Sequence, residues 1–384
     1  MAAILTLNAG SSSIKFGVYA TGEEPDSLAS GQIDRLGPEA RLIVEAGGGR
    51  EERAVEAADH RAGVAAILEA IRPATAGREV AGVGHRVVHG GTGFDAPAEL
   101  TAEVRDRLAA LVPLAPLHQP HNLAAVEAAV AAFPGALQVG CFDTAFHRGH
   151  PFVADAFALP RRFYDEGVRR YGFHGLSYDY IAGRLAQAHP ALHAGRVVVA
   201  HLGNGASMCA LRGGRSVASS MGFSALDGLP MGTRCGQIDP GVLLYLMDRG
   251  MGAEDLTRLL YRESGLLGLS GVSHDMRTLL ASSDPRAAEA IAYYAHRIGR
   301  EIGAMAAELG GLDALVFTGG VGENAAPIRA QALARLGWMG LAVDAEANDA
   351  GAGEIGAGEV PVLVIPTDEE RVIARAVQAA LSAR

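Results

Sequence analysis

Two apolar stretches near the start of the chain are separated by a run of small polar residues. Residues 4–8 and 14–19 have the β-branched and aromatic content of strands, and Gly10 and three serines at 11–13 lie between them. This pattern predicts a hairpin whose turn presents backbone N–H groups and hydroxyls, with Lys15 directly behind it. Such a turn suits phosphate groups, although an ordinary hairpin turn with a surface lysine fits the same residues.

Strand-like and helix-like segments alternate along the rest of the chain. We expect strands at 83–89, 137–142, 197–202, 314–318 and 360–365, a polar loop at 47–52, and helices at 59–71, 101–111, 122–132, 177–188, 284–309, 326–336 and 369–381. This alternation predicts an α/β fold with mixed or parallel sheets flanked by helices. Ligands gather at the C-terminal ends of strands in such folds, where Asp143, Asn204, Gly319 and Asp368 fall.

The second half of the chain repeats the pattern of the opening hairpin. The strand at 197–202 leads into a glycine-rich turn at 203–207 and a further apolar piece at 208–211. We therefore expect a duplicated architecture with two phosphate-facing turns opposed across a cleft, although two unrelated hairpins fit as well. A length of 384 residues suits two domains, and the pattern becomes irregular at 149–163.

Composition and charge narrow the functional classes. A net charge of −10 without any basic run of five argues against a general nucleic-acid binder. The three cysteines are too widely spaced for a zinc knuckle or a disulfide framework, which fits a reducing compartment. The N-terminus lacks the pattern of a signal peptide, and no apolar run reaches the length of a membrane span. We therefore expect a cytoplasmic protein without membrane or nucleic-acid partners.

Several catalytic motifs are absent from the sequence. It has no G-x-x-x-x-G-K-[ST], no G-x-S-x-G and no H-E-x-x-H. Residues 351–356 match G-x-G-x-x-G, but a polar segment precedes them instead of a strand, so we interpret the match as accidental. The reaction class must therefore be inferred from polar residues on glycine-rich turns.

Five such residues are candidates for chemistry. Arg86 interrupts an apolar strand and needs an anionic partner, which is either a ligand or a structural carboxylate. Arg234 and His174 lie between glycines, and two arginines of this kind suit a carboxylate or a transferring phosphoryl group. Asp143 and Glu369 suit Mg²⁺, although each also fits the first turn of a helix. His118 is a weaker candidate, and His85 and His89 lie on a strand, where their spacing does not suit a metal.

Eight segments in order along the chain resemble the acetate kinase family. They are residues 7–16, 84–91, 142–147, 171–177, 201–205, 231–234, 317–324 and 366–370, which read LNAGSSSIKF, GHRVVHGG, FDTAFH, YGFHGLS, HLGNG, MGTR, FTGGVGEN and PTDEE. The resemblance implies two duplicated domains of the acetate and sugar kinase and actin type. The first would comprise residues 1–147 and 371–384 and the second residues 148–370. It also implies a homodimer and reversible phosphoryl transfer from ATP to acetate.

The resemblance also implies roles for individual residues. The catalytic residues would be Asn8, Arg86, Asp143, His174 and Arg234, with His174 and Arg234 stabilising the transition state. Asn8 and Glu369 would support Mg²⁺ or Mn²⁺. Acetate would be held by Arg86, Val88, Leu117, Phe173 and Arg234. The nucleotide would be bound by Ser11, Ser13, Lys15, His201, Leu202, Gly203, Asn204, Gly205, Gly319, Gly320, Val321, Gly322, Glu323 and Asn324.

Departures from the family pattern bear on the substrate. Ala225 stands where a proline commonly lines the acyl pocket, and Gln119, Cys235, Gln237 and Asp368 also differ from the usual residues. An extra methylene in an apolar pocket is worth only about 1–3 kcal/mol, so propionate or a broader range of short-chain carboxylates is an alternative. A non-catalytic ATP-binding module and a sugar kinase are the alternatives from other classes.

Overall fold

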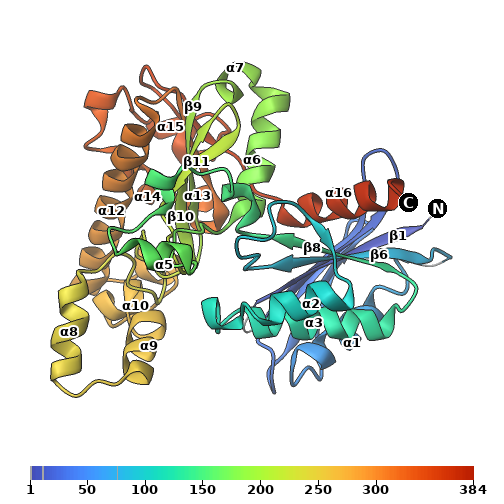
Figure 1. The fold of residues 1–384 in the computed structure, drawn as a ribbon. Coiled ribbons are helices and arrows are strands. Elements are labelled where there is room, and N and C mark those ends of the chain that lie inside the picture. Colours follow the sequence, from blue (N-terminus) through green and yellow to red (C-terminus); the bar gives the residue numbers. More distant parts are fainter. Residues whose placement is uncertain (1, 11–12, 76) are drawn as a thin grey trace. The chain divides into compact units, whose positions relative to one another are not determined.

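The structure is a computed structural model that describes residues 2–10, 13–75 and 77–384 (Figure 1). The chain forms two compact units, and each is described by itself. Unit 1 comprises Met1–Arg148 and Asp368–Arg384, and unit 2 comprises Gly149–Thr367. The second boundary therefore lies three residues before the expected one at 370/371, so that Asp368, Glu369 and Glu370 belong to unit 1.

Unit 1 is built on an eight-stranded mixed sheet. Its strands are β1 (Ala3–Ala9), β2 (Ile14–Ala20), β3 (Asp26–Asp34), β4 (Arg41–Ala46), β5 (Gly49–Ala54), β6 (Val80–Val87), β7 (Ala98–Glu99) and β8 (Leu137–Phe142). The order is β5-β4-β3-β2-β1-β6-β8-β7, with β1, β6 and β8 parallel and the other pairs antiparallel. The hairpin expected at the start of the chain is thus formed by β1 and β2.

Helices cover both faces of this sheet (Figure 1). Alternate residues of β1 pack with α1 (His60–Ala70) and α3 (Gln119–Ala132) in one aliphatic core, and α2 (Ala102–Ala109) packs on α3. The last helix, α16 (Glu369–Ser382), lies on the opposite face against β6, β1 and β8. Gly82 and Gly84 make room for it, because a Cβ at either position would overlap the side chain of Val377.

Unit 2 contains a five-stranded mixed sheet. Its strands are β9 (Arg196–Leu202), β10 (Ala206–Arg212), β11 (Arg215–Ser219), β12 (Ala314–Thr318) and β13 (Val362–Val364), in the order β11-β10-β9-β12-β13. The strands β9, β12 and β13 are parallel, and β10 is antiparallel to both β9 and β11. The same order and directions occur in β3-β2-β1-β6-β8 of unit 1. The expected duplication is therefore present in the sheets.

Helices make up most of the rest of unit 2. They are α4 (Phe152–Asp155), α5 (Arg161–Asp165), α6 (Gly175–Ala188), α7 (Pro190–His193), α8 (Pro240–Asp248), α9 (Ala253–Arg262), α10 (Gly265–Ser270), α11 (Met276–Leu280), α12 (Pro285–Leu309), α13 (Gly319–Asn324), α14 (Ala326–Leu333) and α15 (Ala345–Asp349). Short 3-10 turns are η1 (Val112–Leu114) and η2 (Ala145–His147) in unit 1 and η3 (Gly337–Met339) in unit 2. No helix among the described residues is both long and apolar enough to span a bilayer.

Two local predictions were wrong. The polar segment 47–52 is not a loop throughout, because β5 (Gly49–Ala54) pairs with β4 although all six of its residues are exposed. An edge strand with no buried face lacks the apolar alternation that identifies strands. The helix expected at 177–188 begins two residues earlier, since α6 starts at Gly175 with His174 at the N-cap position.

Candidate active site

A charged cluster in unit 1 lies where three neighbouring parallel strands end. The Arg86 side chain comes from β6, between Asn8 on β1 and Asp143 directly after β8. Its Nε donates to Asp143 Oδ1 at 2.9 Å, its Nη2 to Asp143 Oδ2 at 2.6 Å, and its Nη1 to Asn8 Oδ1 at 3.0 Å. The arginine thus has the carboxylate partner that its apolar strand requires, and this pair positions its planar fork.

Two further carboxylates reach this cluster from the first turn of α16. The Asn8 Nδ2 group donates to Glu369 Oε2 and to Glu370 Oε1, each at 3.4 Å. Glu369 Oε2 also lies 3.9 Å from Nε of Arg86. Asp368 caps the helix by accepting from the backbone N–H of Arg371 at 3.0 Å. Glu369 is therefore both a first-turn residue and a member of the cluster, whereas the sequence analysis treated these as alternatives.

Negative charge exceeds positive charge in this cluster. Burial raises the pKa of Glu369 to about 7, Asp143 and Glu370 act in the same direction, and Arg86 and Lys15 oppose the shift. Burial alone would lower the pKa of Arg86, but the carboxylates of Asp143 and Glu369 outweigh it and raise that pKa. A divalent cation would relieve the crowding of carboxylates, and the oxygen donors present suit Mg²⁺.

Backbone and histidine hydrogen bonds fix the two flanking residues of the predicted phosphate turn, Gly10 and Ser13. The Gly10 N–H donates to the carbonyl of Ser13 at 2.8 Å, and His60 Nε2 donates to the carbonyl of Gly10 at 2.6 Å. The ring of His60 in turn stacks on His121 with centroids 4.6 Å apart. Ser11, which was also expected to bind nucleotide, lies outside the described residues. The histidine support of this turn was not anticipated from sequence.

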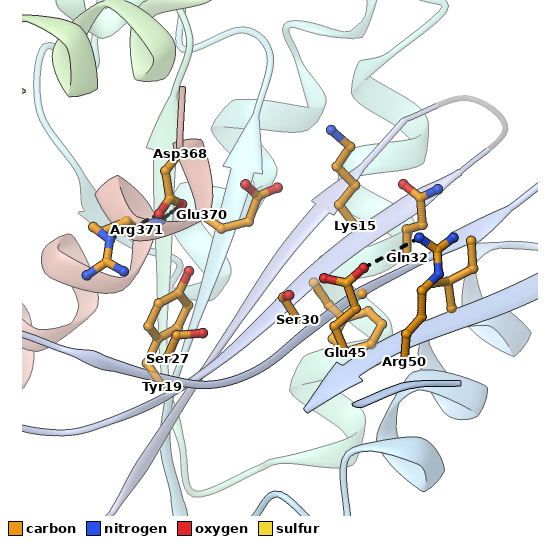
Figure 2. A pocket seen from close by; sticks show the side chains of 13 residues that line it. Lys15, Tyr19, Ser27, Ser30, Gln32, Glu45, Arg50, Asp368, Glu370 and Arg371 are labelled. Atoms are coloured by element: carbon orange, nitrogen blue, oxygen red, sulfur yellow. Dashed lines mark hydrogen bonds and ion pairs between the residues drawn. The ribbon is translucent and has the colours of Figure 1, made fainter. Parts of the chain in front are cut away.

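Lys15 points away from the turn, onto the face of the sheet. It pairs with Asn8 across β1 and β2, and Figure 2 shows its side chain extending into a pocket of about 430 Å³ that Glu370 also lines. Two ion pairs border this pocket, Glu45 with Arg50 at 3.7 Å and Asp368 with Arg371 at 3.0 Å. Lys15 is thus next to the charged cluster, and its charge acts on Glu369.

Two stacked histidines lie beside the glycine-rich turn of unit 2. The rings of His174 and His201 have centroids 4.3 Å apart. Nδ1 of His174 is hydrogen-bonded to Ser207 Oγ at 2.8 Å, and Nδ1 of His201 to Ser177 Oγ at 2.8 Å. His174 adopts a left-handed conformation with φ of 57°, which L-residues rarely adopt and which often marks functional sites.

Arg234 reaches the same turn. A Cβ added to Gly205 would lie 3.3 Å from His174 Nε2 and 3.9 Å from Arg234 Nη1, so the glycine allows both side chains to approach. The Arg234 Nη1 group donates to the carbonyl of Ala225 at 2.9 Å. Ala225, the position at which the sequence departs from the family, therefore helps to orient Arg234 through its backbone.

The two turns expected to bind nucleotide line one pocket in unit 2. Gly203 and Asn204 follow β9, and Gly320, Val321 and Asn324 belong to α13, which begins directly after the neighbouring parallel strand β12. The pocket has a volume of about 610 Å³, which is in the range of small-molecule sites. His274, Asp275, Met276 and Arg277 complete one wall, and the sequence analysis did not identify them.

The turn at Gly319–Asn324 is fixed by hydrogen bonds with side chains within it and after it. Glu323 Oε1 accepts from the backbone N–H of Gly319 at 2.8 Å and of Thr367 at 3.2 Å. The buried Arg329 donates from Nη1 to the carbonyls of Gly322 and Glu323 at 2.9 Å each. Glu323 is one of the residues expected to contact nucleotide, and its Oε1 atom also connects the start of α13 to the segment at Thr367. Arg329 could have been identified from the sequence, because it shares the apolar face of its helix with Ala332 and Leu333.

The residues expected to line the acetate pocket are apolar and mostly buried. Val88 and Phe173 are 5% and 2% exposed, and Leu117 is partly exposed. Val88 follows β6, and its N–H donates to Asn122 Oδ1 at 2.9 Å. His118, a weak candidate, occupies the N-cap position of α3. His85 bonds with Gln138 Oε1 at 2.8 Å through Nε2.

Comparisons with known proteins identify one family to which the chain is similar. A model of the acetokinase family matches residues 3–375. An acetate kinase from Methylocella silvestris is 54% identical, with 98% of each chain covered. A crystal structure of Porphyromonas gingivalis acetate kinase has a TM-score of 0.88 at 39% identity, covering 99% of this chain and 100% of that one.

A propionate kinase is also similar. The crystal structure of the enzyme from Francisella tularensis has a TM-score of 0.92 at 34% identity, covering 98% of this chain and 99% of that one. The matches to acetate kinases extend over nearly the whole length of both chains. Residues 3–375, which match the family model, span all eight segments that first pointed to this family. The chain belongs to the acetokinase family, whose members are phosphotransferases with a carboxyl group as acceptor.

Proposed function

We propose that the protein is an acetate kinase that transfers the γ-phosphoryl group of ATP directly to acetate, giving acetyl phosphate and ADP. Its membership of the acetokinase family over almost the full chain carries this proposal. A carboxylate oxygen of acetate forms the new bond to phosphorus while the bond to the ADP oxygen breaks, and the reverse reaction follows the same path. Acetate is ionised near neutral pH, so no general base is required.

The pocket of unit 2 is the proposed nucleotide site. It brings the Gly203 and Gly320 turns together, and both follow strand ends, where nucleotides bind in open α/β sheets. Backbone N–H groups at the start of a helix favour phosphate oxygens. Arg277, whose side chain is 91% exposed at this wall, pairs with Asp275 at 2.6 Å and is a further candidate for contacting the nucleotide.

The charged cluster of unit 1 is the proposed magnesium site. Glu369, Asn8 and the neighbouring Glu370 offer oxygen ligands, and their crowding favours a divalent cation. Among the described residues no group of three or more His, Cys, Asp and Glu is arranged as a complete metal cage. Mg²⁺ commonly uses only one or two carboxylates plus water and phosphate oxygens, so this donor set fits it. When bound, the ion would neutralise charge on the phosphate oxygens.

The protein contributes positioning and positive charge to the transfer. Arg86 is oriented by Asp143 and Arg234 by the carbonyl of Ala225, so each presents its remaining N–H groups in a fixed direction. We assign to these two arginines the binding of acetate and the neutralisation of the charge that develops during transfer. His174, whose orientation is fixed through Nδ1, would stabilise the transferring phosphoryl group from its other edge.

The substrate test compares short-chain carboxylates. Purified protein is incubated with ATP, Mg²⁺ and acetate, propionate or butyrate, and the acyl phosphate is trapped with hydroxylamine. The proposal predicts the highest kcat/KM for acetate. Propionate should come second, because Ala225, which bonds with Arg234, stands where a bulkier proline commonly lines the acyl pocket. A preference for propionate would identify a propionate kinase, as the Francisella tularensis relative is named. ATP hydrolysis at the same rate without any carboxylate would support a nucleotide-binding module instead.

A matched pair of variants tests the role of Arg234. Arg234→Ala should lower kcat/KM by about 100-fold or more, the usual cost of removing one stabilising donor. Arg258→Ala is the control, since Arg258 is an exposed arginine of the same unit paired with Asp255 at 2.8 Å. Both variants should retain the circular dichroism of the parent. Wild-type rates in Arg234→Ala would refute the assignment.

We also propose a homodimer formed through α8. This helix has no buried residue, and Leu244, Tyr245 and Met247 are 65%, 55% and 54% exposed. Contiguous exposed apolar surface of this kind marks protein interfaces. Sedimentation should give twice the chain mass, and Leu244→Asp should shift the protein towards monomer. A monomeric parent would refute the proposal.

The proposed location is the cytoplasm. Cys141, Cys209 and Cys235 are free thiols, and burial raises the pKa of Cys209 to about 12, which leaves it unreactive. Fractionation of the source cells with an antibody against the protein tests this location.

A further inference from the structure

A second groove lies in unit 2, and none of the residues that line it has been assigned a role above. It has a volume of about 490 Å³ and is lined by residues of α12, of α14 and of the segment from Ala334 to Trp338. The helices α12 and α14 pack against each other and lie side by side in Figure 1. The groove is lined by Ala292, Ala295, His296, Gly299, Arg300, Gly303, Gln331, Ala332, Ala334, Arg335, Leu336 and Trp338. Its size is that of a small-molecule site.

The floor of the groove consists of small residues of α12. Gly299 is required by close helix packing, because a Cβ there would lie 2.7 Å from the carbonyl oxygen of Ala332 on α14. Gly303 is different, since a Cβ at this position would have no atom within 4 Å. Helix packing therefore explains why residue 299 is a glycine, but it does not explain why residue 303 is one. The absence of a side chain at Gly303 leaves that end of the groove open.

Trp338 forms one wall. It is the only tryptophan of the chain, and 80% of its surface is exposed. Tryptophan is normally well buried, because its large ring gains much free energy when it is removed from water. An exposed indole beside an apolar floor offers a flat surface against which another ring can stack.

The ionisable side chains that line the groove are all basic. His296, Arg300 and Arg335 line it, and no carboxylate does so among the described residues. In the described part of the chain, neither arginine forms an ion pair within 4 Å of a carboxylate, unlike Arg258 and Arg277 of the same unit. This local positive charge is notable in a chain with a net charge of −10. It gives the groove charge complementarity to an anion.

We propose that this groove binds a small anion with a flat aromatic or heterocyclic body. The ring would lie between Trp338 and the floor of α12, and the anionic group would lie beside Arg300 and Arg335. Stacking on the indole and burial of the ring supply affinity, while the two guanidinium groups select for negative charge. None of the lining residues is assigned to the proposed phosphoryl transfer, so binding in the groove can be tested independently of activity.

The single tryptophan provides a direct measurement. Trp338 fluorescence is followed while the protein is titrated with 1-anilinonaphthalene-8-sulfonate, a planar aromatic anion. Energy transfer from the indole to the probe reports binding close to Trp338. N-phenyl-1-naphthylamine, which has the same rings without the sulfonate, is the matched neutral probe. We expect saturable quenching by both probes, with tighter binding of the anion.

Variants separate the contributions of charge and shape. The double variant Arg300→Gln, Arg335→Gln should weaken binding of the anionic probe by about tenfold or more and leave the neutral probe unchanged. Gly303→Leu should abolish the response to both probes by filling the groove, whereas Gly303→Ala should retain it. All three should keep the parental circular dichroism and kinase activity.

Three results would overturn the proposal. The first is the absence of saturable quenching in the parent protein. The second is an unchanged affinity for the anionic probe in the double arginine variant or in Gly303→Leu. The third is a change of sedimenting mass in Gly303→Leu, which would show that the groove is an interface between copies of the chain.

Discussion

The two units share one strand order but place different chemistry at matching positions. In unit 1 the second residue pair from the turn of the β1–β2 hairpin is Asn8 with Lys15. In unit 2 the second pair from the turn between β9 and β10 is His201 with Ser207. On the next parallel strand, Arg86 of unit 1 corresponds to Thr318 of unit 2. One sheet therefore ends in a cluster of arginine and carboxylates, and the other in histidine, serine and threonine at the matching positions.

We expect this difference to divide the work of the proposed phosphoryl transfer between the two units. The sheets fix where a side chain projects near a turn, whereas the residue type decides what it binds. The carboxylates of unit 1 suit a metal ion, and its arginine suits the negative charge of a transferring phosphoryl group. The glycine-rich turns of unit 2, which line a pocket, suit the nucleotide. Exchanging matched residues between the units tests this division.

The largest effect is expected from Arg86→Thr, which places the residue of unit 2 in the charged cluster. Threonine suits a strand, but the change leaves Asp143 buried without its cationic partner. We expect kcat to fall by about 1,000-fold, at the upper end for the loss of one preorganised donor, with the fold retained. Steady-state assays measure this, and Arg86→Lys should recover only part of the rate, because lysine cannot form the bidentate pair. A rate within threefold of the parent would refute the proposed role.

His174→Ala is expected to have the next largest effect. Removing the ring should lower kcat by about 100-fold and change the KM for ATP little, since we assign His174 to the transition state. Ser207→Ala should have a smaller effect of about tenfold, because it removes only the partner of Nδ1. If KM rose and kcat were unchanged in His174→Ala, the histidine would belong to nucleotide binding instead.

The turn after β12 is more tightly constrained than the matching point of unit 1. Gly319 has φ of 78°, and a Cβ there would lie 2.8 Å from the carbonyl oxygen of Leu202, whereas Val87 continues β6 at the matching position. Gly319→Ala should lower the free energy of unfolding by about 2 kcal/mol and weaken ATP binding. Gly320→Ala is the control, since its Cβ would meet no atom within 4 Å. Equal stability of the two variants in denaturant titrations would contradict this view.

The smallest effect is a change in pH dependence. Burial lowers the pKa of His85 to about 4 from an ordinary value of 6.5, with the Gln138 hydrogen bond partly opposing the shift. The unfolded chain therefore takes up a proton that the folded chain does not, and stability falls as the pH drops from about 6.5 to about 4.

His85→Phe introduces the residue found at the matching position of unit 2, Phe317. It should lower stability at pH 8 by about 1–3 kcal/mol, because Gln138 loses its partner. The slope of unfolding free energy against pH should decrease by up to about 1.4 kcal/mol per unit between pH 6 and 5. Denaturant titrations at pH 8, 6 and 5 measure both changes, and identical slopes would show that His85 is protonated in the folded protein.

The sequence predicted the features that depend on local pattern. The hairpin of β1 and β2, the strand before Asp143 and the start of α16 all carry their signal in adjacent residues. The resemblance to a family then identified which polar residues to examine. Arg86, Asp143 and Asn8 are indeed brought together, and so are His174 and Arg234 around Gly205.

The supporting contacts could not be predicted in this way. Glu370 accepts a hydrogen bond from Asn8, which lies 362 positions away in the sequence. Arg329 donates to the Gly322 carbonyl of the preceding helix, and no hydrophobic periodicity in the sequence predicts this contact. The wall at His274–Arg277 also depends on how α11 packs within unit 2. Such contacts follow from the topology of the sheets rather than from spacing along the chain.

The return of α16 to the first unit has a consequence for synthesis of the protein. Glu369 and Glu370 are made after more than nine tenths of the chain, yet they complete a cluster that begins with Asn8. While the chain is still on the ribosome, the cluster lacks two of its carboxylates and the sheet lacks the helix that covers Gly82 and Gly84. Prematurely terminated chains should therefore lack the carboxylates of the proposed metal site, and only complete translation products should become active.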